Sequence, residues 1–362
     1  MSPLLISKSK RVPNNHIQYI VVDLFCGAGG TTTGFEHVAG VKVVACVNHD
    51  ENAIRSHEAN HPDCEHYTED ITCLYGIVRN GILFKTERMR HLLRLVELYR
   101  AFYPGVKVIL WASLECTNFS KAKGGKPRDA DSRTLANHMD RYVIPLAPEY
   151  LKIENVVEFM AWGPLDENGK PVSKRNGRDF MRWCNHIDSL GYRNDWKELN
   201  AADFGAYQSR QRLFGVFAAA GLPIVWPDPT HQDPKKKKKA HSVPDLFGMP
   251  VHRLQPWKAV KDVLDFSDEG KSIFDRKKPL SDKSLERIYA GLVKFVAGGK
   301  DAFMVKYNSM SQSGKYCAPS IEEPCPTVAT QNRLYMAFIS KYFSGRPEGK
   351  VIPVEGPAGT VT

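Results

Sequence analysis

Residues 22–30 read Val22-Asp23-Leu24-Phe25-Cys26-Gly27-Ala28-Gly29-Gly30, so an apolar run ends at a carboxylate and three glycines follow. Glycine reaches positive φ and lets a ligand approach the backbone, and the helix expected next offers its N-terminus to a negative group. The pattern predicts a cofactor-binding turn. The spacing is not GxGxxG and no GxxxxGK[ST] follows, so the dinucleotide and ATP signatures are absent. An ordinary strand-to-helix turn is the alternative.

Outward from this turn, apolar β-rich runs alternate with helical stretches, which predicts an α/β fold with a doubly wound, mostly parallel sheet. Strands are expected at 20–25, 41–47, 106–111 and 150–153, and helices at 31–38, 51–60, 86–103 and 132–144. Ligands bind such sheets beyond the carboxyl ends of the strands. One crevice is therefore expected to collect the polar strand-end residues Asp23, Asn48, Asp70, Cys116 and Glu154.

The chain has 362 residues, enough for a full α/β core and a second, smaller domain. Past Ala220 prolines become frequent and a lysine run occupies 235–239. We expect an N-terminal arm at 1–17, the cofactor-binding domain at 18–220, and a linker with a smaller mixed domain at 221–362. The lysine run is either a solvated linker or a phosphate contact.

The net charge and the cysteine content limit the partners and the cellular compartment that we expect for this protein. The net charge of +10 suits a polyanionic partner, although charge alone does not identify one. The eight cysteines form no CxxC pair and no His/Cys cluster with metal-ligand spacing, so we expect reduced thiols and no metal. Without a signal peptide or an apolar run of membrane-span length, a soluble cytoplasmic protein with no membrane partner is expected.

Cys116 lies at a strand exit and precedes a basic, flexible stretch that contains Ser120, Lys121 and Lys123. A cysteine near a glycine turn, with lysines just beyond it, is typical of a nucleophile. The alternative is a buried, inert cysteine.

Two further segments carry candidate chemistry. Glu154 and Asn155 end another expected strand, which places a carboxylate for acid–base work; a capping or solvent-facing glutamate is the alternative. Within residues 207–214, Arg210 and Arg212 alternate ahead of an apolar run, so both guanidinium groups are expected on one strand face. Such a pair would hold a phosphate and a base carbonyl, whereas the alternative is an exposed basic strand edge.

Taken in order, DLFCGAGG, EDI, the strand-end cysteine loop, DSR, ENV and QSRQR resemble the DNA cytosine-5 methyltransferase family over roughly residues 18–230. The resemblance implies a Rossmann-like fold and a target-recognition role for part of 221–362. It also implies the cofactor S-adenosyl-L-methionine, the product S-adenosyl-L-homocysteine, and double-stranded DNA as partner. A target cytosine inside the duplex would have to be flipped out.

The resemblance also implies roles for single residues. Cys116 would attack C6 of cytosine, Glu154 would engage N3 and the exocyclic amine, and Arg210 with Arg212 would contact base and phosphate. The residues implied to bind the cofactor are Asp23, Phe25, Gly27, Ala28, Gly29, Asn48, His49, Asp70 and Ile71. Those implied to bind substrate are Ser120, Lys121, Lys123, Arg133, Asn155 and Gln208.

The sequence departs from the family pattern in three places. Glu115 and Thr117 replace the usual proline and glutamine around the nucleophile, and an anion beside a thiol is expected to lower its thiolate fraction. Asn48 replaces the usual acidic ribose ligand, so weaker cofactor binding is expected. The family's late segments are not found, which leads us to expect a truncated chain or a second polypeptide.

Three functions remain in competition. The leading one is a DNA cytosine-5 methyltransferase in a bacterium or phage-infected cell, either for restriction–modification or for phage protection. The second is a tRNA cytosine-5 methyltransferase with the same fold and cofactor. The third is a catalytically weak DNA-binding subunit, which Glu115 and the absent segments would explain.

Overall fold

The computed structural model describes residues 16–79, 82–114, 135–164, 166–167, 172, 177–235, 254–265, 273, 277–300, 302–306, 316, 318–328 and 334–338. The chain divides into two compact units. The first contains the residues up to Leu199 together with Arg212–Trp226, and the second contains Asn200–Gln211 together with the residues from Pro227 onward. The segment Asn200–Gln211 thus groups with the second unit although it precedes Ala220.

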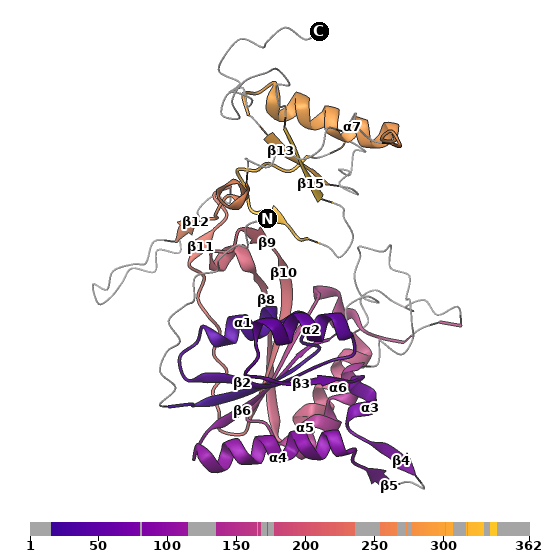
Figure 1. Ribbon diagram of the computed structural model, residues 1–362, viewed down its shortest axis with the longest axis vertical. Helices are drawn as coiled ribbons and strands as arrows, with labels where there is room; N and C mark the ends of the chain where they lie inside the picture. Colours follow the sequence, from indigo (N-terminus) through magenta and orange to yellow (C-terminus); the bar gives the residue numbers. More distant parts are fainter. Residues whose placement is uncertain are drawn as a thin grey trace, which may run out of the picture. The chain divides into compact units, whose positions relative to one another are not determined.

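The first unit is built on a seven-stranded sheet in the order β3-β2-β1-β6-β7-β10-β8 (Figure 1). Strands β3, β2, β1, β6 and β7 are parallel, and β10 is antiparallel to β7. The predicted doubly wound, mostly parallel α/β sheet is therefore confirmed, and the carboxyl ends of its parallel strands share one edge. Its strands are β1 (Tyr19–Leu24), β2 (Val41–Asn48), β3 (Glu65–Thr68), β6 (Lys107–Ser113), β7 (Tyr150–Asn155), β8 (Tyr192–Asn200) and β10 (Gln211–Ala219).

Helices cover both faces of this sheet (Figure 1). One face carries α1 (Gly30–Glu36) and α2 (Glu51–Asn60), and the other carries α4 (Glu87–Phe102), α5 (Asp140–Leu146) and α6 (Arg178–Ser189). Side chains alternate between the faces along β1, so Val22 joins the larger core while Val21 packs with Ile54 of α2. The smaller elements are α3 (Ile71–Leu74), the hairpin of β4 (Ile77–Arg79) and β5 (Ile82–Phe84), and 3-10 turns at Leu135–His138 and Val157–Ala161.

Aromatic rings fill the end of the larger core beneath α6. Trp183 packs edge-on against Phe217 with ring centroids 5.3 Å apart, and Trp196 packs edge-on against Phe180 at 5.0 Å. Pairs in this geometry each contribute about 0.5–1.5 kcal/mol beyond their burial. This cluster holds α6 against β8 and β10.

Where the structure describes it, the second unit contains short strand pairs and one longer helix. Strand β13 (Ala302–Lys306) pairs antiparallel with β15 (Leu334–Phe338), and Phe303 of β13 is fully buried. The two-residue strands are β9 (Gln208–Ser209), β11 (His231–Gln232), β12 (Gln255–Pro256) and β14 (Cys325–Pro326); the helical segments are Ala201–Phe204, Val260–Val263, α7 (Asp282–Gly291) and a π-helical turn at Leu292–Val296.

Several sequence expectations are confirmed closely, since α2 has the predicted bounds and β1, β2, β6 and α4 differ from theirs by one or two residues. The helix expected at 132–144 is different: where the structure describes it, a 3-10 turn precedes α5, which continues to Leu146. The structure has no helix, among the residues that it describes, with the length and apolar character to cross a membrane.

Candidate functional site

The glycine turn leaves β1 in a backbone conformation that few residues adopt. Phe25, Gly27 and Gly29 all have positive φ, at 61°, 56° and 99°. The Cys26 amide donates to the Val47 carbonyl at 3.2 Å, which ties the turn to the end of β2. A Cβ at Gly27 would meet no atom within 4 Å, so this side of the turn is open to a ligand.

Gly29 faces the opposite situation, because the backbone here packs directly on α2. A Cβ at Gly29 would lie 2.7 Å from Cδ2 of His61 and 3.2 Å from Cδ2 of His57. The hydroxyl of Thr33 donates to the Gly29 carbonyl at 2.9 Å and lies 3.1 Å from Nε2 of His61. Only glycine combines the left-handed backbone with this close contact.

Asp23 lies beneath the turn and is fully buried. Its Oδ2 accepts a hydrogen bond from the Thr32 hydroxyl at 3.1 Å, and Thr32 lies 3.0 Å from Nε2 of His57. Burial raises the pKa of Asp23 to about 7, although the bond from Thr32 lowers it in part. Burial also lowers the pKa of His57 to about 4, and His61 and His66 add to this effect. Asp23 therefore supports the turn from within the fold.

The end of β2 supplies the next pair of predicted residues. Asn48 is half-buried and His49 is exposed. The Asn48 side-chain carbonyl accepts from the Asp50 amide at 2.9 Å, and the Asp50 carboxylate caps α2 by accepting from the amides of Asn52 and Ala53. The cap fixes where β2 stops and thus where Asn48 stands.

Asp70 follows β3 and caps α3 in the same manner. Its Oδ1 accepts from the amide and the hydroxyl of Thr72 at 2.7 and 2.5 Å. Partial burial raises the pKa of Asp70, but the two bonds from Thr72, together with the nearby His49 and His138, lower it further, so the net shift is downward. Its neighbour Ile71 is buried, and the Ile71 carbonyl accepts a 2.6 Å bond from the hydroxyl of Tyr142 on α5.

Five predicted residues, Cys116, Ser120, Lys121, Lys123 and Arg133, lie outside the described residues. The chain is described up to Leu114, whose carbonyl accepts from the Asn155 side-chain amide at 3.4 Å. Asn155 is 1% exposed and also accepts from the Val156 amide at 2.8 Å. It holds the start of the cysteine segment against the end of β7.

Glu154 and Arg212 face each other at the same sheet edge. Oε1 of Glu154 lies 3.1 Å from Nε of Arg212, with about one sixth of each side chain exposed. In the antiparallel pair β7–β10, Glu154 stands opposite Phe214, two residues from Arg212 and therefore on the same face. The guanidinium fixes the direction of a carboxylate that is still in part accessible.

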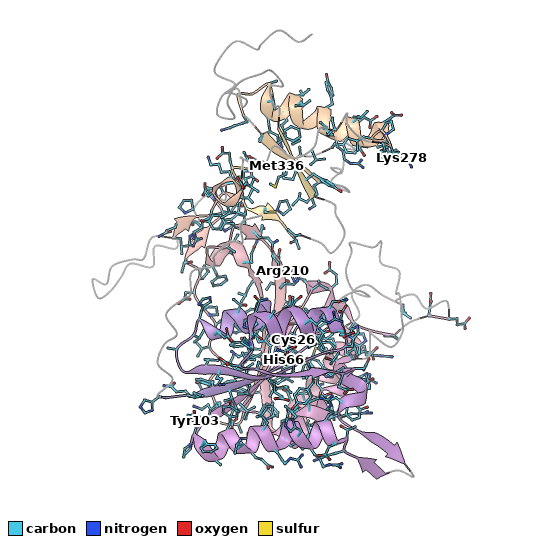
Figure 2. The ribbon with its side chains drawn as sticks, viewed as in Figure 1. Cys26, His66, Tyr103, Arg210, Lys278 and Met336 are labelled. Atoms are coloured by element: carbon cyan, nitrogen blue, oxygen red, sulfur yellow. The ribbon has the colours of Figure 1, made fainter. Side chains whose placement is uncertain are left out.

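Arg210 lies outside the strand that carries Arg212, so the expectation that the two guanidinium groups share one strand face stays a prediction. Arg210 lies between β9 and β10, where the extended ladder is interrupted, and its carbonyl accepts from the Ala201 amide at 3.0 Å. Arg210 (Figure 2) and Gln208 belong to the second unit, whereas Arg212 belongs to the first. Gln208 pairs with Cys325 of β14, a partner too distant in sequence for local alternation to reveal.

Sequence reasoning missed the supporting residues His57, Asp50 and Tyr142. Asp50 had a local signal, since an Asp directly before a helical stretch is a favoured N-cap. Tyr142 and His57 had none, because their partners lie far away in the chain.

The chain matches the family model described as C-5 cytosine-specific DNA methylase over residues 19–288. It is similar to the type II methyltransferase M.AgeI of Thalassovita gelatinovora, with 28% identity over 72% of this chain and 53% of that protein. The type II methyltransferase M.XorII of Xanthomonas oryzae is 29% identical over 58% of this chain and 43% of its own length. The chain thus spans about half the length of these curated relatives.

Among solved structures, the chain is similar to one described as a DNA modification methyltransferase encoded within a prophage of E. coli. The identity is 22%, the TM-score is 0.42, and the match covers 70% of this chain and 55% of that one. None of these comparisons supports the expected second polypeptide.

The glycine turn gives the first prediction. Gly29→Ala should lower the free energy of unfolding by at least about 1–2 kcal/mol, because alanine strains the left-handed backbone and its Cβ meets His61. Gly30→Ala is the matched control, since Gly30 begins α1 and a Cβ there meets nothing within 4 Å. It should leave stability unchanged or higher. Chemical denaturation of both variants tests this, and equal effects would contradict the assignment.

The buried carboxylate of Asp23 gives a pH dependence with a definite sign. Its folded pKa of about 7 exceeds the ordinary 3.8, so between these values the folded state holds a proton that the unfolded state has lost. The stability of the wild type relative to Asp23→Asn should therefore fall by about 1.4 kcal/mol per pH unit from about pH 4 to about pH 7 and then level off. Denaturation of both proteins across this range measures it, and a pH-independent difference would refute it.

Proposed function

Because the chain belongs to the C-5 cytosine-specific DNA methylase family, we propose that it transfers a methyl group from S-adenosyl-L-methionine to C5 of a cytosine flipped out of double-stranded DNA. One observation carries the proposal. The glycine turn, Asn48, Asp70 and the Glu154–Arg212 pair all stand at the carboxyl edge of one parallel sheet, where ligands of such folds bind.

The residues at this edge fit the cofactor. The open side of the turn at Gly27 and the exposed Ala28 leave room for the methionine part, with Phe25 beside them. Asn48 and His49 would contact the ribose, and Asp70 with Ile71 the adenine. The buried Asp23 would act through the turn that it supports. The cofactor supplies an electrophilic methyl group.

The protein's own residues would supply the activation of the base. C5 of cytosine becomes nucleophilic when the Cys116 thiolate adds to C6, and Glu154 would assist by sharing a proton with N3. After C5 has gained the methyl group, it would give its proton to solvent water, the proton on N3 would return to Glu154, the bond from sulfur to C6 would break, and the thiolate would be restored. Arg212 would keep the Glu154 carboxylate directed, and Asn155 would hold the chain that leads to Cys116.

The remaining predicted residues would bind the nucleic acid. Ser120, Lys121, Lys123 and Arg133 supply hydroxyl and cationic groups close to Cys116 in sequence. In the second unit, Gln208 and Arg210 would add polar and cationic contacts. The names of the two curated relatives support a role in restriction–modification, and the family description favours DNA over RNA.

Covalent trapping tests the function. Duplex DNA prepared with 5-fluorocytosine in place of cytosine should form a stable adduct with the protein when the cofactor is present, because fluorine cannot leave as a proton does. The adduct should disappear in Cys116→Ser and persist in Cys184→Ser, a matched change at a buried thiol of α6. Denaturing gel electrophoresis measures it. No adduct in the wild type would favour the binding subunit, and preferential methylation of tRNA over duplex DNA would favour the RNA enzyme.

Glu154 gives a second functional prediction. Glu154→Gln keeps the shape of the side chain but cannot share a proton, so single-turnover methyl transfer should fall by about 10²-fold or more. Glu97→Gln is the control, because Glu97 is an exposed residue of α4. Transfer of labelled methyl groups to DNA measures both, and wild-type rates in Glu154→Gln would exclude this role.

A further inference from the structure

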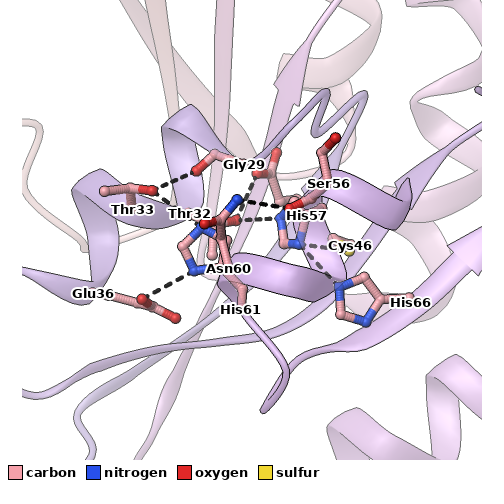
Figure 3. Close-up of polar contacts among 11 residues, drawn as sticks. Gly29, Thr32, Thr33, Glu36, Cys46, Ser56, His57, Asn60, His61 and His66 are labelled. Carbon is pink, nitrogen blue, oxygen red and sulfur yellow. Dashed lines mark hydrogen bonds and ion pairs between the residues drawn. The ribbon is translucent and has the colours of Figure 1, made fainter. Parts of the chain in front are cut away.

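Five thiol and imidazole side chains meet under the glycine turn. Figure 3 shows three of them, Cys46, His57 and His66. They come from the turn itself (Cys26), from β2 (Cys46), from α2 (His57), and from the start of β3 (Cys64 and His66). The ligand atoms of Cys26, Cys46 and His57 all lie within 4.8 Å of one another, and so do those of Cys46, Cys64 and His66. Cys46 belongs to both groups and is therefore the centre of the cluster.

A β-bulge directs Cys46 into this cluster. The pairing of β1 with β2 shifts between Val21, which stands opposite Val43, and Val22, which stands opposite Ala45. Val44 is the extra residue, and both Val44 and Ala45 pack in the larger core. Alternation then resumes with Cys46 on the α1/α2 face, in one row with Asp23 of β1 and His66 of β3. Bulges of this kind re-aim side chains.

Hydrogen bonds fix which nitrogen of His57 faces the thiols. Thr32 donates its only hydroxyl proton to Asp23, so it accepts from Nε2–H of His57 at 3.0 Å. The lone pair of His57 is then on Nδ1, which lies 3.6 Å from Sγ of Cys46 and 3.0 Å from Nε2 of His66. A metal-binding histidine is characteristically oriented through its other ring nitrogen in this way.

The distances fit a tetrahedral ion. Zinc bonds of about 2.3 Å to sulfur and about 2.05 Å to nitrogen place the two ligand atoms about 3.6 Å apart at the tetrahedral angle. Sγ of Cys46 and Nδ1 of His57 are at this separation. The three cysteines are at most 7% exposed, so the site is closed to solvent, as structural zinc sites are.

We propose that this cluster binds one structural zinc-class divalent ion, with Cys46, Cys26 and His57 as ligands and Cys64 or His66 as the fourth. Each coordinating thiol gives its proton to solvent, and no electron is transferred. The ion would join the glycine turn to α2 and β3. The proposal goes beyond methyl transfer and does not depend on it, because metal content is measured without any substrate. It also replaces the expectation, drawn from cysteine spacing, that the protein holds no metal.

Metal analysis of the 362-residue protein tests the proposal. Protein purified without chelator should contain about one zinc per chain, and Cys46→Ser should contain less than a tenth of that amount. After the zinc is replaced by Co²⁺, thiolate-to-cobalt charge-transfer absorption should appear in the wild type. Comparing Cys64→Ser with His66→Ala identifies the fourth ligand, because replacing the ligand should weaken Co²⁺ binding more than replacing the other residue.

Cys184→Ser is the matched control, since Cys184 is equally buried but packs in the aromatic core. It should keep the metal. If Cys46→Ser does not fold, cysteine alkylation of the wild type tests the proposal instead. Adding Zn²⁺ to chelator-treated protein should protect three thiols from alkylation if Cys64 is the fourth ligand, and two thiols if His66 is. Absence of zinc with no cobalt absorption, zinc retained in a folded Cys46→Ser, or a disulfide among these cysteines would overturn the proposal.

Discussion

The arrangement of β1, α1 and α2 at the carboxyl edge of the sheet depends on the buried carboxylate of Asp23. A buried carboxylate without a hydrogen-bond partner lowers the stability of the folded state. The hydroxyl of Thr32 supplies a partner for Asp23 and also contacts His57. This chain of contacts joins β1, α1 and α2, the three elements that surround the glycine turn. The turn can keep its left-handed backbone because the elements on either side of it are held to one another.

The same edge brings together groups that are far apart in the chain. Parallel pairing aligns the ends of β3, β2, β1, β6 and β7, and the antiparallel strand β10 returns Arg212 to the end of β7 beside Glu154. Side-chain caps at Asp50 and Asp70 decide where each helix begins after its strand. The proposed chemistry depends on this alignment, because binding of a cofactor and activation of a base must occur at one place.

The thiol and imidazole cluster lies under the glycine turn and is built from residues of the turn, β2, α2 and the start of β3. Cys26 belongs both to the glycine turn and to the cluster, and His57 contacts both Thr32 and Cys46. The bulge at Val44 interrupts the regular pairing of β2 with β1 and thereby places Cys46 on the sheet face that α1 and α2 cover. An ion held there would stiffen the turn without contacting the cofactor.

The sequence alone was sufficient for the local features. Alternating apolar runs predicted the strands and helices of the parallel sheet, the glycine pattern predicted the turn, and Glu154 was recognised from its position at a strand end. These signals lie within a few residues of one another, where periodicity and backbone preference act. Tertiary structure alone decided which distant groups meet: Arg212 with Glu154, and Cys46 with Cys26, Cys64 and two histidines. These contacts are determined by the strand register, by the residue inserted at the β2 bulge and by helix packing. None of the three can be recognised from the spacing of residues in the sequence.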